Sequence, residues 1–268
     1  MSTVTSQDGT TIAYTRTGSG PAVILVDGAM CHREFGPAKP LAAELAPHFT
    51  VYTYDRRGRG ESGESGDTEP FSVAREVEDI AALIKEAGGA AHVYGISSGA
   101  ALALEAAKAG LPITKLAVYE FPLVVDDTRP PVPADYTARL ETAIATGRPG
   151  TAIKTFMREG VRVPAPVVFM MQFMPAWPKL KKVAPTLRYD AALFDGLHDG
   201  TPLPEGRWAS VSVPTLVMDG GKSPAWIRNG VAALAKAVPG AEHKTIEGQT
   251  HMLKPKAVAP VLIEYFNG

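Results

Sequence analysis

The 268-residue chain has little cysteine, no marked excess of either charge and no long apolar run. Cys31 is its only cysteine, which excludes an internal disulfide and fits a reducing compartment. The 27 basic side chains nearly balance the 28 acidic ones, so no bulk positive charge points to nucleic acid. No window approaches the roughly 20 apolar residues of a membrane span. We therefore expect neither a nucleic-acid nor a membrane partner.

The amino terminus also lacks the marks of a secretory signal peptide. Residues 1–8 contain neither a basic stretch nor an apolar one, so we expect no signal peptide there. Together with the single cysteine, this indicates a cytoplasmic protein. We expect the Cys31 side chain to serve as a small apolar group rather than as a catalytic thiol.

Short apolar segments alternate along the chain with helical patterns. The wholly apolar run at residues 22–26 is typical of a strand in a sheet that is covered on both faces. Further strands are predicted at residues 11–17, 49–55, 92–96, 115–120, 214–219 and 242–247. Helices are predicted at residues 73–87, 98–109, 224–237 and 256–266. This alternation predicts an α/β fold with a mostly parallel, doubly wound sheet.

One long segment interrupts the alternation. Between residues 122 and 206 the chain has many prolines and short helical patterns, the clearest at residues 136–146 and 150–159. A structureless loop of that length is improbable in a compact domain. We therefore expect a core domain made of residues 1–121 and 207–268, with a helical cap at 122–206 that can cover a pocket.

The stretch Gly95-Ile96-Ser97-Ser98-Gly99 fits the pattern G-x-S-x-G between a predicted strand and a predicted helix. Small residues two before and two after a serine allow it to sit on a tight, strained turn, with its hydroxyl raised above the sheet edge. The start of the following helix offers the Ser98 N–H to an oxyanion. The sequence therefore predicts Ser97 as a nucleophile and Ser98 as an oxyanion donor.

Two further loops are expected to complete this site, because ligands bind such sheets at the carboxyl ends of the strands. The loop after residues 22–26 contains Gly28 and Ala29, whose N–H groups are candidates for the second oxyanion donor. Serine also needs a base that accepts its proton. Of the six histidines, His251 lies in a loop between the last predicted strand and the last helix, where its side chain can reach the nucleophile.

Taken together, these motifs resemble the α/β-hydrolase superfamily over essentially the whole chain. Residues 54–62 match its D-x-x-G-x-G-x-S turn, and Asp27-Gly28 stands where the superfamily often has His-Gly. The resemblance implies an eight-stranded sheet with an inserted helical cap, and no cofactor or metal. The glycines at 58, 60 and 63 fit G-x-G-x-x-G, but no helix follows directly to receive a pyrophosphate. We interpret the arginines at 56, 57 and 59 as residues that brace this turn.

The third member of the triad is ambiguous in the sequence. Where the superfamily usually carries an aspartate after its next-to-last strand, this chain has Ser223. A serine does not stabilise an imidazolium as an anion does. Glu120 ends the strand expected next to that of Ser97, about 5 Å away, and is our first candidate for the acid. Asp219 is the alternative.

Glu120 is also supported by a narrower resemblance. Haloalkane dehalogenases and zearalenone-type lactonases use a glutamate at this strand end. The lactonases also have an Asp-Gly oxyanion loop, an S-S-G-A turn like residues 97–100, and a Glu-x-Pro segment like residues 120–122. The dehalogenases differ in their aspartate nucleophile. The resemblance to lactonases implies a Ser-His-Glu triad made of Ser97, His251 and Glu120.

Three functions are compatible with these residues. The first is a serine hydrolase that cleaves a small, apolar carboxylic ester or lactone through an acyl-enzyme. The second is cleavage of a carbon–carbon bond, or a cofactor-free lyase reaction, on the same triad. The third is a ligand-binding module with little turnover, for which Ser223 is the best argument. Candidates for the substrate pocket are Met30, His32, Arg33, Phe121, Met170, Met174 and Trp177.

Overall fold

The computed structural model of the protein describes residues 2–64 and 71–268. Eight strands form one sheet in the order β1-β2-β4-β3-β5-β6-β7-β8. The edge strands β1 (Ser2–Thr5) and β2 (Thr11–Thr17) pair antiparallel with each other, and β2 pairs antiparallel with β4 (Thr50–Tyr54). All pairs from β4 to β8 are parallel. The predicted eight-stranded, mostly parallel sheet is thus confirmed.

The centre of the sheet is buried on both faces. Its strands are β3 (Ala22–Val26), β5 (Ala91–Ile96), β6 (Ile113–Tyr119) and β7 (Thr215–Gly220), and β8 (Glu242–Ile246) forms the far edge. Valine, isoleucine and leucine dominate β3, and all its residues but the first are buried, as a strand covered on both faces requires. The parallel strands bring their carboxyl ends, and hence the loops after them, to one end of the sheet.

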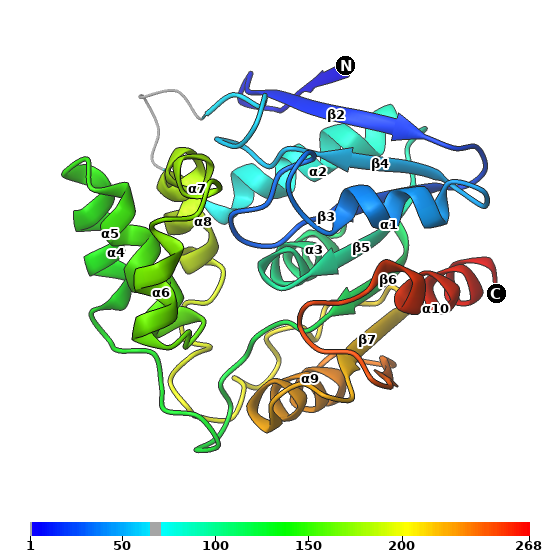
Figure 1. The fold of residues 1–268 in the computed structure, drawn as a ribbon. Coiled ribbons are helices and arrows are strands. Elements are labelled where there is room, and N and C mark those ends of the chain that lie inside the picture. Colours follow the sequence, from blue (N-terminus) through cyan, green and yellow to red (C-terminus); the bar gives the residue numbers. More distant parts are fainter. Residues whose placement is uncertain (1, 65–70) are drawn as a thin grey trace.

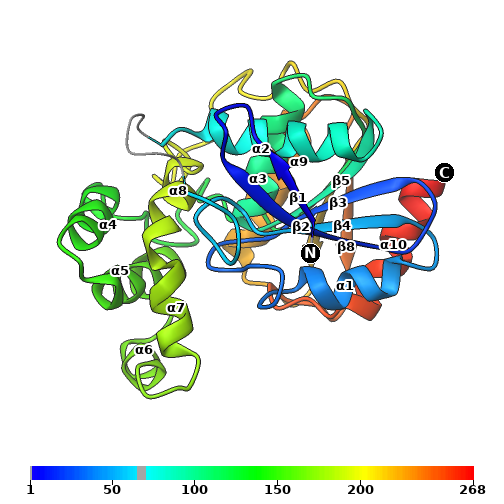
Figure 2. The same ribbon diagram turned by 90° about the horizontal axis from the view of Figure 1, so that it is seen from above.

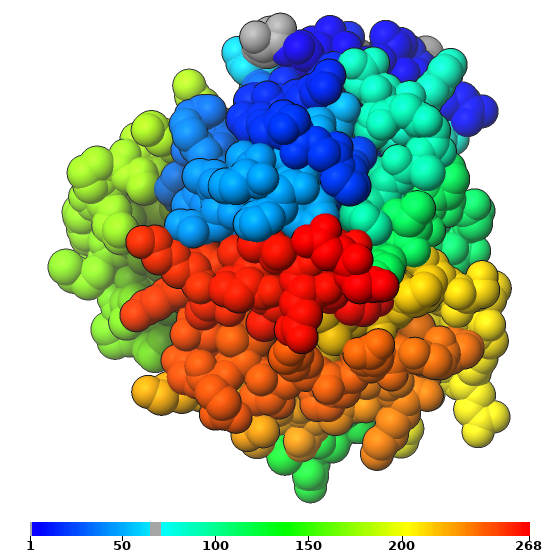
Figure 3. Space-filling view, turned by 90° about the vertical axis from the view of Figure 1, so that its right-hand side faces the viewer, coloured from blue at the N-terminus to red at the C-terminus, as the bar shows by residue number. Residues whose placement is uncertain are grey.

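Helices cover both faces of the sheet (Figures 1 and 2). One face carries α2 (Val73–Glu86), α3 (Ser98–Lys108) and α9 (Ala225–Ala237), whose apolar side chains share one buried cluster. The other face carries α1 (Ala38–Leu45) and α10 (Pro255–Asn267), which share a second cluster. Figure 3 shows the red α10 lying directly beside the blue segment that contains α1.

The chain between β6 and β7 forms a helical layer beside one end of the sheet (Figure 1). Its α-helices are α4 (Tyr136–Ala145), α5 (Pro149–Thr155), α6 (Ala165–Met171), α7 (Trp177–Val183) and α8 (Leu187–Ala192). A π-helical turn, Phe156–Gly160, follows α5, and a 3-10 turn, Ala184–Thr186, precedes α8. This layer, called the cap below, has a third apolar cluster of its own. None of the helices in residues 2–64 and 71–268 is both long and apolar enough to cross a membrane.

Candidate active site

Ser97 occupies the turn between β5 and α3, and its φ of 57° lies in the left-handed region. The neighbouring glycines are required by space. A Cβ on Gly95 would lie 2.4 Å from the carbonyl oxygen of Gly99, and a Cβ on Gly99 would lie 2.1 Å from that of Val26. Both distances are far below van der Waals contact, so the packing of this turn explains the G-x-S-x-G spacing. Strained backbone of this kind concentrates at functional sites.

The loop after β3 lies directly against Ser97. A Cβ on Gly28 would lie 3.1 Å from the Cβ of Ser97, and Ala29 lines the same cavity as Ser97 and Ser98. Within the described residues, neither the Ala29 N–H nor the Ser98 N–H donates a hydrogen bond. Two backbone donors beside the hydroxyl are therefore free to hold an oxyanion. Met30 follows with a φ of 61°.

His251 and Glu120 form a hydrogen-bonded pair. Nδ1 of His251 lies 2.8 Å from Oε2 of Glu120. Glu120 follows β6 directly, is fully buried, and has a φ of 44°. His251 lies in the loop between β8 and α10 and is partly exposed to the cavity. A carboxylate that binds Nδ1–H leaves Nε2 of the ring free to accept a proton.

Ser223, which stands at the usual place of the acid, contacts Glu120. Its hydroxyl donates a hydrogen bond of 2.5 Å to Oε1 of Glu120, and the Gly220 N–H donates another of 2.7 Å to the same oxygen. Both oxygens of the buried carboxylate therefore have partners, as a buried anion requires. Sequence reasoning missed this role of Ser223. The sequence did contain a signal for this contact, because a serine stands at the usual acid position, 223, and a glutamate stands at the other possible acid position, 120.

Asp219, the alternative acid, lies away from His251. Its carboxylate accepts a hydrogen bond of 2.7 Å from the Thr245 hydroxyl and one of 3.1 Å from Arg228 Nε, and lies 3.3 Å from His243 Nε2. These partners belong to β8 and α9, so Asp219 joins those elements. In the described residues it is Glu120, and not Asp219, whose carboxylate contacts His251.

Ser97 and His251 line one cavity of about 540 Å³. The cap supplies much of the wall, and apolar side chains from it include Val132, Phe156 and Phe194. Among the described residues no hydrogen bond joins Ser97 to His251. Such pairs are often loose before substrate binds and tighten in the complex.

None of the residues predicted for the substrate pocket lines this cavity. Met30 and Trp177 are buried in the apolar cluster of the cap, where they pack against other cap side chains. Met170 and Met174 lie on the surface, at 62% and 52% exposure. The apolar cluster of the sequence around these methionines therefore did not identify the cavity wall.

The predicted pocket residues of the core domain also have other roles. Phe121 packs against Phe194 and Trp208 in the core. Arg33 is buried and forms ion pairs with Asp55 and Glu61. His32 exchanges backbone hydrogen bonds of 3.0 and 2.7 Å with Phe35 and closes a short loop. None of these three side chains lines the cavity.

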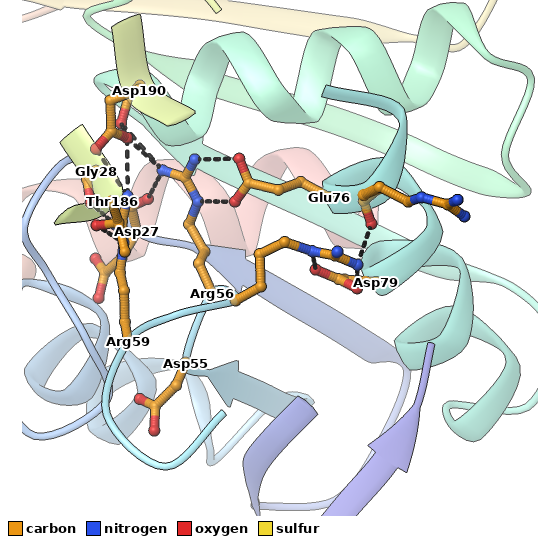
Figure 4. Close-up of polar contacts among 12 residues, drawn as sticks. Asp27, Gly28, Asp55, Arg56, Arg59, Glu76, Asp79, Thr186 and Asp190 are labelled. Carbon is orange, nitrogen blue, oxygen red and sulfur yellow. Dashed lines mark hydrogen bonds and ion pairs between the residues drawn. The ribbon is translucent and has the colours of Figure 1, made fainter. Parts of the chain in front are cut away.

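Three arginines of the glycine-rich turn, at positions 56, 57 and 59, are buried, and Figure 4 shows the polar contacts of Arg56 and Arg59. Arg56 makes two hydrogen bonds of 2.7 Å to Glu76 and one of 2.8 Å to Asp190. Arg59 binds both oxygens of Asp190, at 2.9 and 2.8 Å. Arg57 binds both oxygens of Asp79, at 2.8 and 2.6 Å. The arginines thus link the turn to α2 and, through Asp190 in α8, to the cap.

Asp190 connects the cap to both loops of the predicted oxyanion site. The Ser98 hydroxyl donates a 2.7 Å hydrogen bond to Asp190, and Arg59 donates one of 2.7 Å to the carbonyl oxygen of Gly28. Burial alone would raise the pKa of Asp190, but the charges of Arg59 and Arg56 outweigh it and hold this pKa below its ordinary value. The sequence offered no sign of this pairing, because Asp190 lies far along the chain from both arginines.

We expect Asp190→Asn to lower the free energy of unfolding by about 3–5 kcal/mol, because it leaves Arg56 and Arg59 short of a buried negative charge. Urea denaturation followed by circular dichroism measures this change. Asp127→Asn is the matched control, since Asp127 is an exposed cap residue and its substitution should change the value by less than about 0.5 kcal/mol. Equal stabilities of the two variants would show that the network does not anchor the cap.

The described residues contain no group of three or more histidine, cysteine, aspartate or glutamate side chains that could hold a metal ion. Cys31 is a free thiol close to Asp27, and burial raises its pKa to about 12. A thiol with such a pKa is protonated at neutral pH and is a poor nucleophile.

Comparison with known proteins agrees with the fold. A solved alpha/beta hydrolase from Sphaerobacter thermophilus is 56% identical, with a TM-score of 0.89, and the match covers 99% of this chain and 100% of that one. A thermophilic esterase from Thermogutta terrifontis, solved with malate bound, shares the fold at 22% identity, with a TM-score of 0.67 and coverage of 99% and 97%.

The curated proteins give a shorter match. The uncharacterized hydrolase YraK of Bacillus subtilis is 36% identical over 98 residues, which are 36% of this chain and 35% of that protein. The chain thus matches about a third of the length of this relative. The profile of the alpha/beta hydrolase family, by contrast, matches residues 19–261. Since that match spans most of the sequence, the chain belongs to the alpha/beta hydrolase family.

Proposed function

We propose that the protein is a serine hydrolase that cleaves a carboxylic ester or a lactone through an acyl-enzyme intermediate. The observation that carries this proposal is the 2.8 Å contact between His251 Nδ1 and Glu120 Oε2 in a cavity that Ser97 also lines. A strained serine, an oriented imidazole and a buried carboxylate are the parts that activate a hydroxyl for attack on a carbonyl.

In the proposed reaction, Ser97 Oγ attacks the carbonyl carbon while Nε2 of His251 takes the hydroxyl proton. Glu120 keeps the other ring proton on Nδ1 and stabilises the imidazolium. The N–H groups of Ser98 and of Ala29 or Gly28 hold the oxyanion. The imidazolium then gives its proton to the leaving alkoxide. A water molecule, deprotonated by the same imidazole, releases the acid and restores the serine.

An ester or lactone suits the cavity better than a strongly polar substrate. Much of the wall is apolar, with Val132, Phe156, Phe194 and Trp226 among its residues. Burial of an apolar acyl or alcohol group there contributes about 25 cal/mol for each Å² removed from water. The Thermogutta terrifontis esterase shares this fold, which agrees with the proposed class.

The contact of Ser223 with Glu120 favours an enzyme over a ligand-binding module. The module hypothesis depended on a missing acid at position 223. Ser223 instead donates its hydroxyl to the carboxylate that orients His251, and Gly220 supports the same oxygen. Such a fully bonded carboxylate is the arrangement that a working triad needs. Carbon–carbon bond cleavage uses the same groups, and no contact in the cavity favours it.

The test is covalent labelling with a fluorophosphonate. An activated serine attacks phosphorus, forms the Oγ–P bond and expels fluoride, whereas an ordinary serine hydroxyl hardly reacts. We expect one adduct per chain, located at Ser97 by mass spectrometry of the digested protein. His251→Ala should slow the labelling by about 100-fold or more, because the base is lost. Labelling of another residue, or equal rates in both proteins, would refute the assembled triad.

A further inference from the structure

Strained backbone marks one cap residue as well as the proposed active site. Among the described residues, four that are not glycine have a positive φ: Met30, Ser97, Glu120 and Arg162. The first three are the oxyanion loop, the nucleophile and the acid. A left-handed conformation is unfavourable for a side chain such as arginine, and it persists where the surroundings fix it, often for function. Arg162, at a φ of 68°, is the fourth.

Arg162 follows the π-helical turn Phe156–Gly160 and lines the same cavity as Ser97 and His251. Its side chain is exposed, and within the described residues its guanidinium has no hydrogen-bond acceptor and no ion-pair partner. Lys222 lines the cavity too, and it also lacks a carboxylate partner in the described part of the chain. Cationic side chains in this wall are thus available to a ligand.

Behind this wall lies Arg129, which is only 3% exposed. The other buried arginines of the described chain, at positions 33, 56, 57 and 59, each form an ion pair with a carboxylate. Arg129 has none there, and its Nε and Nη1 have no hydrogen-bond partner. A buried charge without a counter-charge is costly. The cost is reduced when an anion binds nearby.

The contacts of Arg129 place its charge next to Arg162. Its Nη2 donates hydrogen bonds of 2.8 Å to the carbonyl oxygens of Glu159 and Gly160, and its guanidinium lies 4.3 Å from the ring centre of Trp226, a residue of the cavity wall. Burial and the neighbouring charge of Arg162 lower the pKa of Arg129 to about 10. The two guanidinium groups therefore repel each other.

We propose that Arg162 is a specificity-determining residue that binds a carboxylate on the substrate, remote from the bond that is cleaved, with Arg129 as a second positive charge behind it. The inference rests on the proposed function and narrows its substrate class to esters or lactones that carry a free acid group. An anion at Arg162 would form charge-assisted hydrogen bonds and offset the repulsion between the two arginines.

A carboxylate fits this wall better than a phosphate monoester. The wall also contains Asp190, Asp195 and Asp199. Asp190 is neutralised by Arg56 and Arg59, and Asp199 accepts hydrogen bonds from Thr201, so both have their own partners. The negative charges of Asp195 and Asp199 penalise the roughly −2 charge of a phosphate more than the single charge of a carboxylate.

The test compares two substrates of equal length, mono-4-nitrophenyl glutarate and 4-nitrophenyl valerate, which differ by one terminal carboxylate. The measured quantity is the preference, defined as the ratio of their kcat/KM values. We expect the wild type to prefer the glutarate ester, and Arg162→Gln to lower the preference about tenfold or more, mainly through KM. Arg162→Lys should retain part of it. Arg158→Gln, which removes an exposed charge of the same cap segment outside the cavity, should leave it unchanged.

The outcomes separate the two proposals. If the wild type cleaves both esters through Ser97 but shows no preference for the glutarate, or if Arg162→Gln and Arg158→Gln shift the preference equally, the carboxylate site is wrong and the hydrolase proposal stands. If neither ester is cleaved and no fluorophosphonate adduct forms, the proposed function itself is wrong. Repeating the series with succinate, adipate and pimelate monoesters identifies the chain length that best spans the cavity.

Discussion

Replacing Ser97 with alanine should lower kcat for 4-nitrophenyl valerate by about 10⁴-fold or more. The reason is that the variant has no atom that forms the acyl-enzyme, while the oxyanion donors and the base remain. The residual rate then comes from water and the binding site alone. Steady-state kinetics at saturating substrate measure the loss. Circular dichroism should show an intact fold, because alanine differs from serine here by one oxygen that makes no hydrogen bond within the described chain.

Ser210→Ala is the matched control for this substitution. Ser210 is exposed, and its hydroxyl makes only a long contact of 3.5 Å to the carbonyl oxygen of Lys108. Its kcat should stay within about twofold of the wild-type value, since surface substitutions of this kind have little effect. If Ser97→Ala retained more than about a hundredth of the wild-type kcat, attack by water activated directly at His251 would replace the acyl-enzyme mechanism.

The central strands of the sheet could be predicted because each is a short run of mostly apolar residues. Strands β3, β5 and β7 are short apolar runs, and helices α2 and α9 present one apolar stripe each, so the local sequence identifies them. β1 (Ser2–Thr5) was not predicted, because a polar edge strand lacks that pattern. Helix α1 (Ala38–Leu45) was not predicted either. It has prolines close to its start, which are tolerated in the first turn of a helix but read as a loop signal in a sequence.

The triad candidates followed from position along the chain, whereas the cavity wall did not. Ser97, Glu120 and His251 each end or follow a strand, so topology alone brings them to one edge of the sheet. The wall depends on which face of each cap helix is turned inward. Helices α6 and α7 have only seven residues each, too few for a periodic pattern to define a face. The predicted pocket residues Met170 and Trp177 belong to these two helices, and neither lines the cavity.

Polar contacts between distant segments also could not be predicted from the sequence. The bond of Ser223 to Glu120 and that of Arg56 to Asp190 each join residues more than 100 positions apart. Each residue alone is compatible with a surface position. Only the fold shows that the carboxylates of Glu120 and Asp190 are buried, and burial makes a partner obligatory. Buried polar networks of this kind specify how two segments fit together, and they support the site from behind.

Replacing Glu120 with glutamine should lower kcat by about 10³–10⁴-fold, by the loss of the correct histidine tautomer. Oε1 of Glu120 accepts hydrogen bonds from Ser223 and Gly220, so the glutamine would keep its oxygen there and turn its NH₂ toward His251. Nδ1 of His251 would then have to accept a hydrogen bond, and its proton would move to Nε2. With a proton already on Nε2, the ring cannot take one from Ser97. The pH dependence of kcat, together with its magnitude, measures the change.

Asp219→Asn is the decisive comparison, because it makes the same carboxylate-to-amide change at the other acid position. Asp219 binds Thr245 and Arg228, so its loss should reduce stability by about 1–3 kcal/mol while kcat falls less than tenfold. Ser223→Ala should lower kcat by an amount between those of Asp219→Asn and Glu120→Gln. It removes one hydrogen-bond donor from Glu120 but leaves the negative charge in place. If Asp219→Asn lost most of its kcat while Glu120→Gln kept it, Asp219 and not Glu120 would be the acid of the triad. The buried contact of Glu120 with His251 would then be structural, and His251 would have to turn toward β7 and β8 during the reaction.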